Sequence, residues 1–90
     1  MRYSWDRRKA EKNERKHHVR FGEAITVFND PLVVLVEDFE HGEGHYIALG
    51  MSEQQRVLFV VHVELSDDET RIISARRASK HERRHYEEGE

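Results

Sequence analysis

Three arginines near the end of the chain have the type and spacing to do chemistry. Arg71, Arg76 and Arg77 lie close together in the sequence, on either side of Ser74. A guanidinium group matches a phosphate with two parallel hydrogen bonds, and cations held in place stabilise an anionic transition state such as a phosphorane. The alternative is an edge strand whose charges prevent it from pairing with other chains. Three arginines in so short a segment favour a phosphate-binding site.

Histidine and tyrosine supply candidate groups for proton transfer. His17 and His18 close a predicted helix, and a helix C-terminus stabilises the histidine cation. His17 could therefore act as a general acid or base or bind phosphate, although a simple complement to the helix dipole is the commoner role. Tyr86 lies on a basic terminal segment, where a phenol can stack on a base or transfer a proton. Packing of that segment against the rest of the fold is the role that we favour for Tyr86.

A metal site is a weaker hypothesis. His41 and His45 are four residues apart, but a glycine-rich turn lies between them, whereas paired histidine ligands at this spacing normally share a helix. No set of acidic ligands converges with them. We expect His41 and His45 to be surface turn residues and His62 to lie on a strand face. No metal or other cofactor is predicted.

Composition excludes several classes of protein. The chain has 90 residues, of which 37% are charged, and no cysteine. It is expected to form one domain over residues 1–90 with a thin core. Neither an apolar run of about 18 residues nor a signal peptide is present, so a cytoplasmic location without membrane contact is expected. Disulfides, a cysteine nucleophile, a glycine-rich phosphate loop and a nucleophile elbow around Ser74 are also absent.

The net charge of −3 hides a strong asymmetry along the sequence. Residues 1–20 contain eight Lys and Arg against three Asp and Glu, whereas residues 21–70 contain one against eleven. Residues 71–90 contain six against four. If the two ends meet in the fold, they form a basic face on an acidic protein, which suits an anionic partner. Solvated helix surfaces are the alternative.

The elements that must position these groups can be predicted from the apolar pattern. Residues 3–5 could open a strand, and Asp6 is a suitable N-cap for a polar, basic helix over residues 7–17. A second helix over residues 21–28 is predicted by apolar positions at i, i+3, i+4 and i+7, and the Asn-Asp-Pro sequence at residues 29–31 stops it. Those apolar residues are Phe21, Ala24, Ile25 and Phe28.

Four strands with short turns between them follow. Their predicted ranges are residues 32–36, 46–51, 57–63 and 70–77. Strict alternation along the last strand would place Arg71, Ile73, Ala75 and Arg77 on one face and Ile72, Ser74 and Arg76 on the other. A capping box then starts a short helix over residues 80–88. The box consists of Ser79 at the N-cap and Glu82 three residues later.

The order of elements predicts an α+β domain. Short turns imply an antiparallel sheet of four to five strands, with two N-terminal helices and one C-terminal helix packed on it.

The ordered residues also resemble a known family. The N-terminal half is similar to that of the BrnT toxins through Trp5-Asp6, Lys9, Asn13, Lys16-His17, Val19, Phe21, Glu23-Ala24, Val27-Phe28 and Asp30-Pro31. The middle resembles the family through Gly50 and residues 57–63, and the C-terminal part through residues 71–78, Glu82-Arg83 and Tyr86. One departure is His18, because the family usually has glycine after Lys-His. A left-handed helix C-cap is expected there, which histidine tolerates at some cost.

The resemblance implies a RelE-like fold and an RNA endonuclease that stops translation. It implies a type II toxin–antitoxin system in which a BrnA-type antitoxin neutralises this chain. DNA would be bound only indirectly, through the antitoxin, and the assemblies to consider are a homodimer and a heterotetramer with the antitoxin. The reaction would need no metal: the RNA 2′-hydroxyl attacks the neighbouring phosphate and leaves a cyclic phosphate and a free 5′-hydroxyl.

Roles for single residues follow from the same resemblance. Arg71 and Arg76 would hold the phosphate, and His17 and Tyr86 are the candidates for proton transfer. The residues expected to hold the RNA backbone are Lys9, Asn13, Lys16, Arg77 and Arg83. Two other functions stay open: a non-catalytic RNA-binding or regulatory module that uses the same basic face, and an interaction protein whose arginines are buried against a partner.

Overall fold

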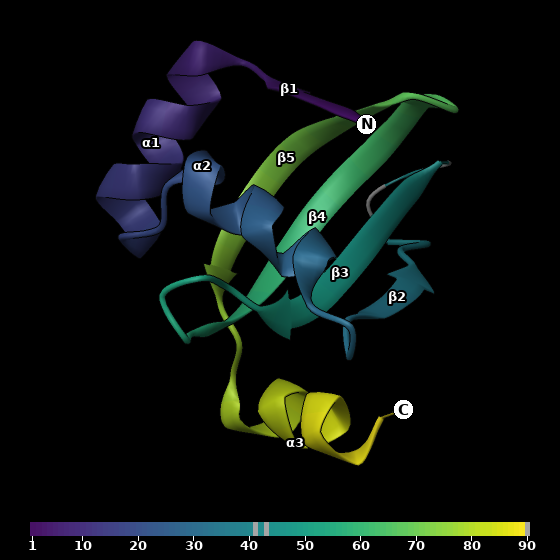
Figure 1. Cartoon of the computed structure of the whole chain (residues 1–90). Helices are drawn as coiled ribbons and strands as arrows, with labels where there is room; N and C mark the ends of the chain where they lie inside the picture. Colours follow the sequence, from purple (N-terminus) through teal and green to yellow (C-terminus); the bar gives the residue numbers. More distant parts are fainter. Residues whose placement is uncertain (41, 43, 90) are drawn as a thin grey trace.

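The computed structural model describes residues 1–40, 42 and 44–89, and its central feature is a mixed sheet (Figure 1). The strands of the described chain are β1 (Arg2–Trp5), β2 (Val34–Glu37), β3 (His45–Met51), β4 (Val57–Ser66) and β5 (Glu69–Arg77). They lie in the order β1-β5-β4-β3-β2. Strands β2 to β5 form an antiparallel meander, and β1 pairs with β5 in parallel.

The helices pack at three places around this sheet (Figure 1). They are α1 (Arg7–His17), α2 (Phe21–Ala24), the 3₁₀ helix η1 (Ile25–Asn29) and α3 (Lys80–Glu88). Helix α1 lies beside β5, α2 and η1 cover one face of the sheet, and α3 lies below its end. No helix of the described residues is long and apolar enough to span a membrane.

The predicted α+β class, three helical regions and the strands of the meander are confirmed, but the purely antiparallel sheet is wrong. The exception is β1, whose Tyr3 and Trp5 pair with Thr70 and Ile72 in the parallel direction. A short turn forces consecutive strands to be antiparallel. Strand β1 is joined to its neighbour by the whole of the intervening chain, so no local signal sets its direction.

The second predicted helix is also corrected. It is α-helical only to Ala24 and continues as the tighter η1, where the Thr26 hydroxyl donates to the carbonyl oxygen of Glu23 at 2.7 Å. Three consecutive β-branched residues, Ile25, Thr26 and Val27, favour this departure from α-helical geometry. The tighter helix packs on β3 at Gly50, where a Cβ atom would lie 3.2 Å from the backbone oxygen of Val27. A bare backbone is therefore needed at Gly50.

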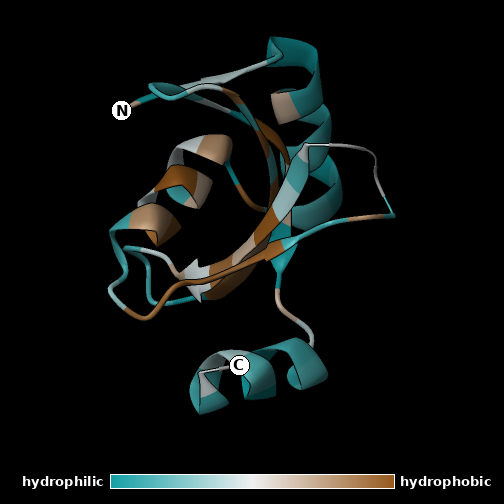
Figure 2. Ribbon diagram, turned by 90° about the vertical axis from the view of Figure 1, so that its right-hand side faces the viewer, coloured by the Kyte–Doolittle hydropathy of each residue, from teal (hydrophilic) through white to brown (hydrophobic). Residues whose placement is uncertain are grey.

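The core lies mainly between the sheet and the helices α1, α2 and η1. Its residues are Val19, Phe21, Ala24, Val27, Ala48, Leu58, Val60, Ile72 and Ala75. A smaller cluster of Leu49, Val57 and Tyr86 packs α3 against the opposite face. Figure 2 shows the apolar residues concentrated on the strands and η1, whereas α1 and α3 are largely hydrophilic.

A β-bulge in β5 changes which residues share a face. Val61 pairs with Ser74 and His62 pairs with Ile72, so Ile73 is an extra residue in the strand. Ile72 and Ala75 consequently both point into the main core, although strict alternation would separate them. The predicted face assignment is therefore wrong beyond Ile72.

The bulge brings two of the three arginines onto one face. Arg71 pairs with Val63, and Arg76 pairs with Phe59. Val63 and Phe59 are four residues apart on β4, which pairs with β3 without a bulge, so their side chains lie on the same face of the sheet. Arg71 and Arg76 thus share the sheet face on which α3 packs, together with Ser74. Arg77 pairs with the core residue Leu58 and belongs to the other face.

Asn13 fixes α1 to the sheet. Its buried side-chain amide donates to the backbone oxygens of Ala75 (2.8 Å) and Val19 (3.0 Å) and accepts from the backbone N–H of Ala75 (3.1 Å). Strand β1 ends at Trp5, opposite Ile72, so the amide of Asn13 pairs with β5 where a neighbouring strand is missing. The segment between α1 and α2 is anchored by the same group.

Replacing Asn13 by alanine should destabilise the fold strongly. The change leaves one N–H and two carbonyl groups without their partner, and an unpaired buried polar group costs about 1–3 kcal/mol. We expect a loss of about 3 kcal/mol in the free energy of unfolding, measured by urea denaturation. Lys12→Ala, on the exposed side of the same helix, is the control and should change stability by less than about 0.5 kcal/mol. A similarly small effect of Asn13→Ala would contradict the bridging role.

His62 is a buried titratable group in the main core. It is 2% exposed, lies between the rings of Phe28 and Tyr46, and its Nδ1 has no hydrogen-bond partner among the described residues. Burial lowers the pKa of His62 below its usual 6.5. The unfolded chain therefore takes up a proton before the folded chain does, and stability falls as the pH drops below 6.5.

This coupling predicts a stability loss between pH 6.5 and 5. The slope can approach at most about 1.4 kcal/mol per pH unit for one proton. Urea denaturation at several pH values should show the loss in the parent protein and a much flatter profile for His62→Leu. Despite opposing desolvation, hydrogen bonds lower the pKa of Glu23 and Asp30, so those carboxylates contribute at lower pH. His17, whose pKa is also lowered, serves as the control: His17→Gln should keep most of the slope. An unchanged slope in His62→Leu would refute the assignment.

Candidate functional site

Arg76 lies at the end of β5 and is held from three directions. Its Nη1 and Nη2 donate to the two carboxylate oxygens of Glu82, both at 2.8 Å, and its Nη1 also donates to the backbone oxygen of Arg77 at 3.2 Å. The guanidinium carbon lies 4.1 Å from the ring centroid of Phe59, a cation–π contact. Hydrogen bonding to Glu82 raises the pKa of Arg76 further, so the group is a permanent cation in a fixed orientation.

Arg71 lies on the same sheet face, but its guanidinium makes fewer interactions than that of Arg76. No hydrogen bond or ion pair of its guanidinium is formed within the described part of the chain. The pKa of Asp6 is lowered mainly by the hydrogen bond from the backbone N–H of Lys9, and the charge of Arg71 adds a smaller effect. Its partner Val63 lies four residues along β4 from Phe59, the partner of Arg76. The two arginine backbones are therefore roughly 13 Å apart, a distance that two side chains reaching towards each other can span.

His17 lies on the last turn of α1, near enough to Arg76 for the two charges to interact. It is half-buried and follows Asn13 by four residues on the same helix face, so the anchor at Ala75 also sets the position of His17. Burial lowers the pKa of His17, and the charges of Lys16 and Arg76 lower it further. These effects oppose the stabilisation of the cation that is expected at a helix C-terminus. Neutral imidazole, which can accept a proton, dominates at pH 7.

Tyr86 is engaged in packing. It is buried against Leu49 and Val57, and its hydroxyl donates to Asp30 Oδ2 at 2.6 Å. Burial and this hydrogen bond raise the pKa of Tyr86 to about 12. These contacts agree with the favoured packing role, and the hydroxyl proton is donated to Asp30 in a hydrogen bond.

The residues expected to hold RNA are placed unequally. Lys9, Lys16, Arg77 and Arg83 are exposed. Asn13 is not, because its amide is buried and bonded to Val19 and Ala75, and its predicted contact with RNA is corrected to a structural role.

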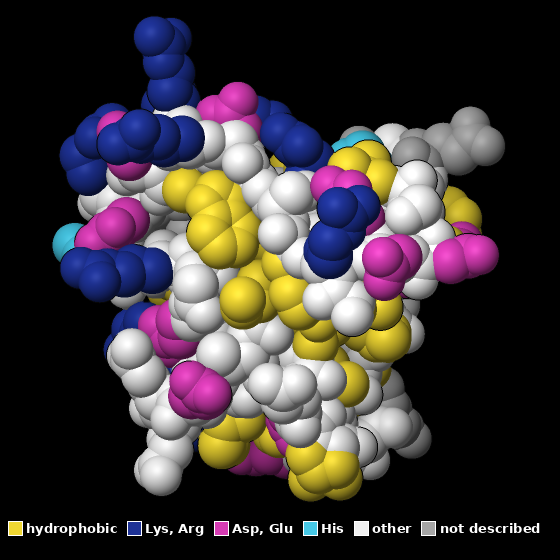
Figure 3. All heavy atoms as spheres, turned by 45° about the horizontal axis from the view of Figure 1, so that its top comes forward, with side chains coloured by type: hydrophobic (Ala, Val, Ile, Leu, Met, Phe, Trp, Pro, Cys, Tyr) yellow, Lys and Arg dark blue, Asp and Glu magenta, His cyan; other side chains and the backbone are white. Residues whose placement is uncertain are grey.

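Two shallow hollows are lined by basic side chains. One, of about 300 Å³ on α1, contains Lys9 and its neighbours Arg8, Lys12 and Arg15. The other, of about 500 Å³ on α3, contains Arg83 with Lys80 and Arg84. Figure 3 shows Lys and Arg side chains gathered on the side of the molecule where α1 lies. Each hollow also contains one carboxylate, Glu11 on α1 and Glu87 on α3, so basic side chains predominate in both.

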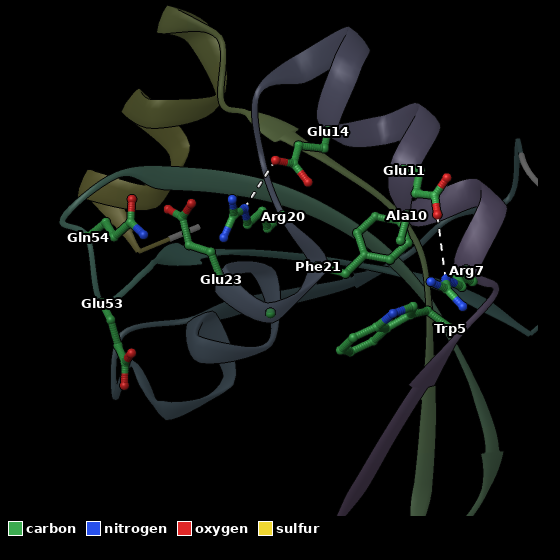
Figure 4. Close-up of a pocket in the computed structure, with 11 residues that line it drawn as sticks. Trp5, Arg7, Ala10, Glu11, Glu14, Arg20, Phe21, Glu23, Glu53 and Gln54 are labelled. Carbon is green, nitrogen blue, oxygen red and sulfur yellow. Dashed lines mark hydrogen bonds and ion pairs between the residues drawn. The ribbon is translucent and has the colours of Figure 1, made fainter.

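A larger groove lies elsewhere and contains none of the predicted site residues (Figure 4). It is formed between α1 and α2 around Trp5, whose ring contacts Phe21 edge-to-face. Its cations are already paired: Arg7 lies 3.5 Å from Glu11, and Arg20 lies 3.1 Å from Glu14. With additional carboxylates in its wall, the groove is a poor match for a phosphate backbone.

The histidines considered for a metal do not converge in the described structure. His62 is buried in the core, and His41 lies outside the described residues. Within residues 1–40, 42 and 44–89, no three His, Cys, Asp or Glu side chains come together as metal ligands would.

Sequence reasoning missed two residues of this site. Glu82 was identified only as a helix cap, which is confirmed by its hydrogen bonds with Ser79, but it also holds Arg76. Phe59 gave no signal beyond its place in an apolar strand. The six-residue spacing from Arg76 to Glu82 could have suggested the ion pair only if the turn between β5 and α3 were known.

Comparison with known proteins identifies the family and supports the fold. A family model described as "Ribonuclease toxin, BrnT, of type II toxin-antitoxin system" matches residues 5–82. The fold is similar to the crystal structure of the Brucella abortus ribonuclease toxin BrnT, with a TM-score of 0.73 and 20% sequence identity. The alignment covers 89% of this chain and 99% of the Brucella chain. Comparison with curated proteins gives no significant match. The family match over most of its length shows that this chain belongs to the BrnT ribonuclease toxins of type II toxin–antitoxin systems.

Proposed function

We propose that this protein is a RelE-like, metal-independent RNA endonuclease that stops translation in the cytoplasm and is neutralised by a BrnA-type antitoxin. The observation that supports this best is the combination of a fixed arginine, a second arginine on the same sheet face, and a neutral histidine within range of the charge of the first. Arg76, Arg71 and His17 come from different ends of the sequence. They supply the two functions that RNA cleavage needs, namely phosphate binding and proton transfer.

In this reaction the RNA supplies its own nucleophile. The 2′-oxygen forms a bond to the adjacent phosphorus while neutral His17 takes the 2′-hydroxyl proton. Arg76 and Arg71 stabilise the negative charge that develops on the phosphoryl oxygens. The bond from phosphorus to the 5′-oxygen then breaks, and water supplies the proton to that oxygen. The hydroxide left behind takes the proton that His17 had accepted, which restores the neutral imidazole. The products are a 2′,3′-cyclic phosphate and a free 5′-hydroxyl.

This scheme does not use Tyr86 for proton transfer. In-line displacement requires the base and the acid to lie on opposite sides of the phosphorus. His17 already serves as the base, and a phenol whose proton is bonded to Asp30 and whose pKa is raised to about 12 is a poor acid at neutral pH. Tyr86 instead helps to hold α3 against the sheet, on the same helix that carries Glu82.

Substrate and antitoxin would compete for one basic surface. Lys9, Lys16 and Arg83 are exposed on α1 and α3, where they could follow the RNA backbone. Arg77, on the other sheet face, would contact RNA only at the end of β5. An antitoxin with acidic residues could cover the same surface, in a heterotetramer or on a toxin homodimer, and carry the complex to promoter DNA.

A non-catalytic RNA-binding module is the second candidate. The basic hollows on α1 and α3 support it, because they would bind a polyanion whether or not His17 and Arg76 act chemically. Both candidates predict affinity that falls as salt rises. Only the first predicts that purified protein produces cyclic-phosphate ends.

Replacing Arg76 by alanine should abolish toxicity while leaving a folded protein. Induced expression of the parent protein in a bacterial host should arrest growth, whereas Arg76→Ala should not, because the transition-state charge loses its fixed cation. Arg2→Ala is the control, since Arg2 is exposed and pairs with Asp68 and Glu69 at the far end of β5, and it should stay toxic. Equal abundance is checked by immunoblot. Full toxicity of Arg76→Ala at equal abundance would exclude its proposed role.

His17 and Tyr86 should separate catalysis from packing. His17→Gln should slow single-turnover RNA cleavage by about 10²–10⁴-fold, the usual contribution of a general base. Tyr86→Phe should cleave within a few-fold of the parent and lose about 1 kcal/mol or more of stability, because Asp30 loses a hydrogen bond. In the parent protein the rate should rise as His17 deprotonates, with a midpoint below pH 6.5 because the pKa of His17 is lowered, and EDTA should be present throughout. The reverse order of effects, or loss of activity in EDTA, would refute the scheme.

A further inference from the structure

The guanidinium of Arg76 has two edges that can each make a pair of parallel hydrogen bonds. Glu82 occupies the end edge, formed by Nη1 and Nη2, with both distances at 2.8 Å. The remaining hydrogen of Nη1 reaches the backbone oxygen of Arg77. The face of the group rests over Phe59. Together these contacts fix the plane of the guanidinium and its rotation within that plane.

The other edge is left open. It consists of Nε–H and the second hydrogen of Nη2, and neither donates to any group in the described part of the chain. Two parallel N–H donors can bind a phosphate through a bidentate pair of hydrogen bonds. A phosphate can therefore bind to Arg76 without displacing the carboxylate of Glu82.

Glu82 is itself held rigidly. Its Oε1 accepts from the backbone N–H of Ser79 at 2.8 Å, and its own N–H donates to the Ser79 hydroxyl at 3.2 Å. The helix that carries it is joined to the sheet through Ala78, whose N–H donates to the oxygen of Val57, and through Tyr86 and Asp30. The orientation of Arg76 is thus set by the docking of α3.

We propose that Glu82 is a positioning residue, which holds the open edge of Arg76 towards the scissile phosphate. The proposal rests on the ribonuclease function above and extends it, because it makes α3 the support of the catalytic arginine. The opposite arrangement would be a competing carboxylate that must leave before phosphate can bind. The two differ in sign: removing a support slows cleavage, whereas removing a competitor speeds it.

Glu82→Gln is the variant that separates these roles. Glutamine at the third helical position preserves the capping box. It offers Arg76 only one oxygen, because its amide nitrogen cannot accept from the second N–H. We expect kcat to fall about 10-fold or more while KM changes less than about 3-fold, as orientation rather than affinity is lost. Glu88→Gln, an exposed carboxylate on the same helix, is the matched control and should behave as the parent protein does.

A double-mutant cycle tests whether Glu82 acts through Arg76. Lysine has no guanidinium edges to orient, so Glu82→Gln should cause little further loss of kcat in an Arg76→Lys background. Equal losses in both backgrounds would show that Glu82 affects the rate by another route and would overturn the proposal. Faster cleavage by Glu82→Gln alone would also overturn it, because that result identifies a competitor.

An NMR measurement decides the positioning independently of RNA cleavage. In the parent protein the paired carboxylate should restrict rotation about the Nε–Cζ bond of Arg76 and keep its Nη signals distinct. Titration with inorganic phosphate should shift the Arg76 Nε–H signal. In Glu82→Gln the Nη signals should average and the phosphate shift should shrink, whereas identical behaviour of the two proteins would refute the proposal. If the parent protein shifts in this way but cuts no RNA, the ribonuclease mechanism fails while the positioning of Arg76 stands.

Discussion

The amide of Asn13 satisfies the exposed backbone of β5 beyond the point where β1 ends. A strand edge next to a packed helix needs hydrogen-bond partners that a hydrophobic contact cannot supply. Asn13 provides both a donor and an acceptor to Ala75, and its second donor anchors the chain at Val19. The polar helix α1, which has few apolar residues of its own, is held in register with the sheet by this one side chain. His17 lies one turn further along, and its position is set by the same register.

The bulge in β5 complements this anchor. If β5 alternated strictly from Arg71 to Arg76 with no bulge, the two arginines would lie on opposite faces of the sheet. The bulge places them together on the face opposite the main core while Ile72 and Ala75 remain buried. A single irregularity therefore lets one strand serve the core on one side and a cationic surface on the other.

The other charged groups near the core are paired in a way that joins helices to strands. Glu23 is buried and accepts hydrogen bonds from Arg56 and from the Ser52 hydroxyl, which ties α2 to the turn between β3 and β4. Glu82 and Asp30 do the same for α3, through Arg76 and Tyr86. Breaking one partner of such a pair leaves the other charge poorly solvated, so these carboxylates stabilise the docked helices only while they remain ionised.

The sequence by itself determined the elements that depend on local signals. Asp6 and Ser79 start helices α1 and α3 as N-caps, the left-handed C-cap at His18 closes α1, and short turns produce the antiparallel meander. Apolar periodicity and turn residues act over a few positions, so they can be identified without knowledge of distant partners. The family resemblance likewise rested on residues whose order is visible in the chain.

Only the tertiary structure decided the direction of β1, the bulge at Ile73, and the partners of Asn13, Glu82 and Tyr86. Each of these depends on contacts between residues that are distant in sequence or on a break in strand periodicity. The same polar side chain can face solvent, RNA or a buried carbonyl, and composition does not distinguish these environments. Asn13 illustrates this: the family resemblance suggested an RNA contact, whereas the unsatisfied edge of β5 required its amide.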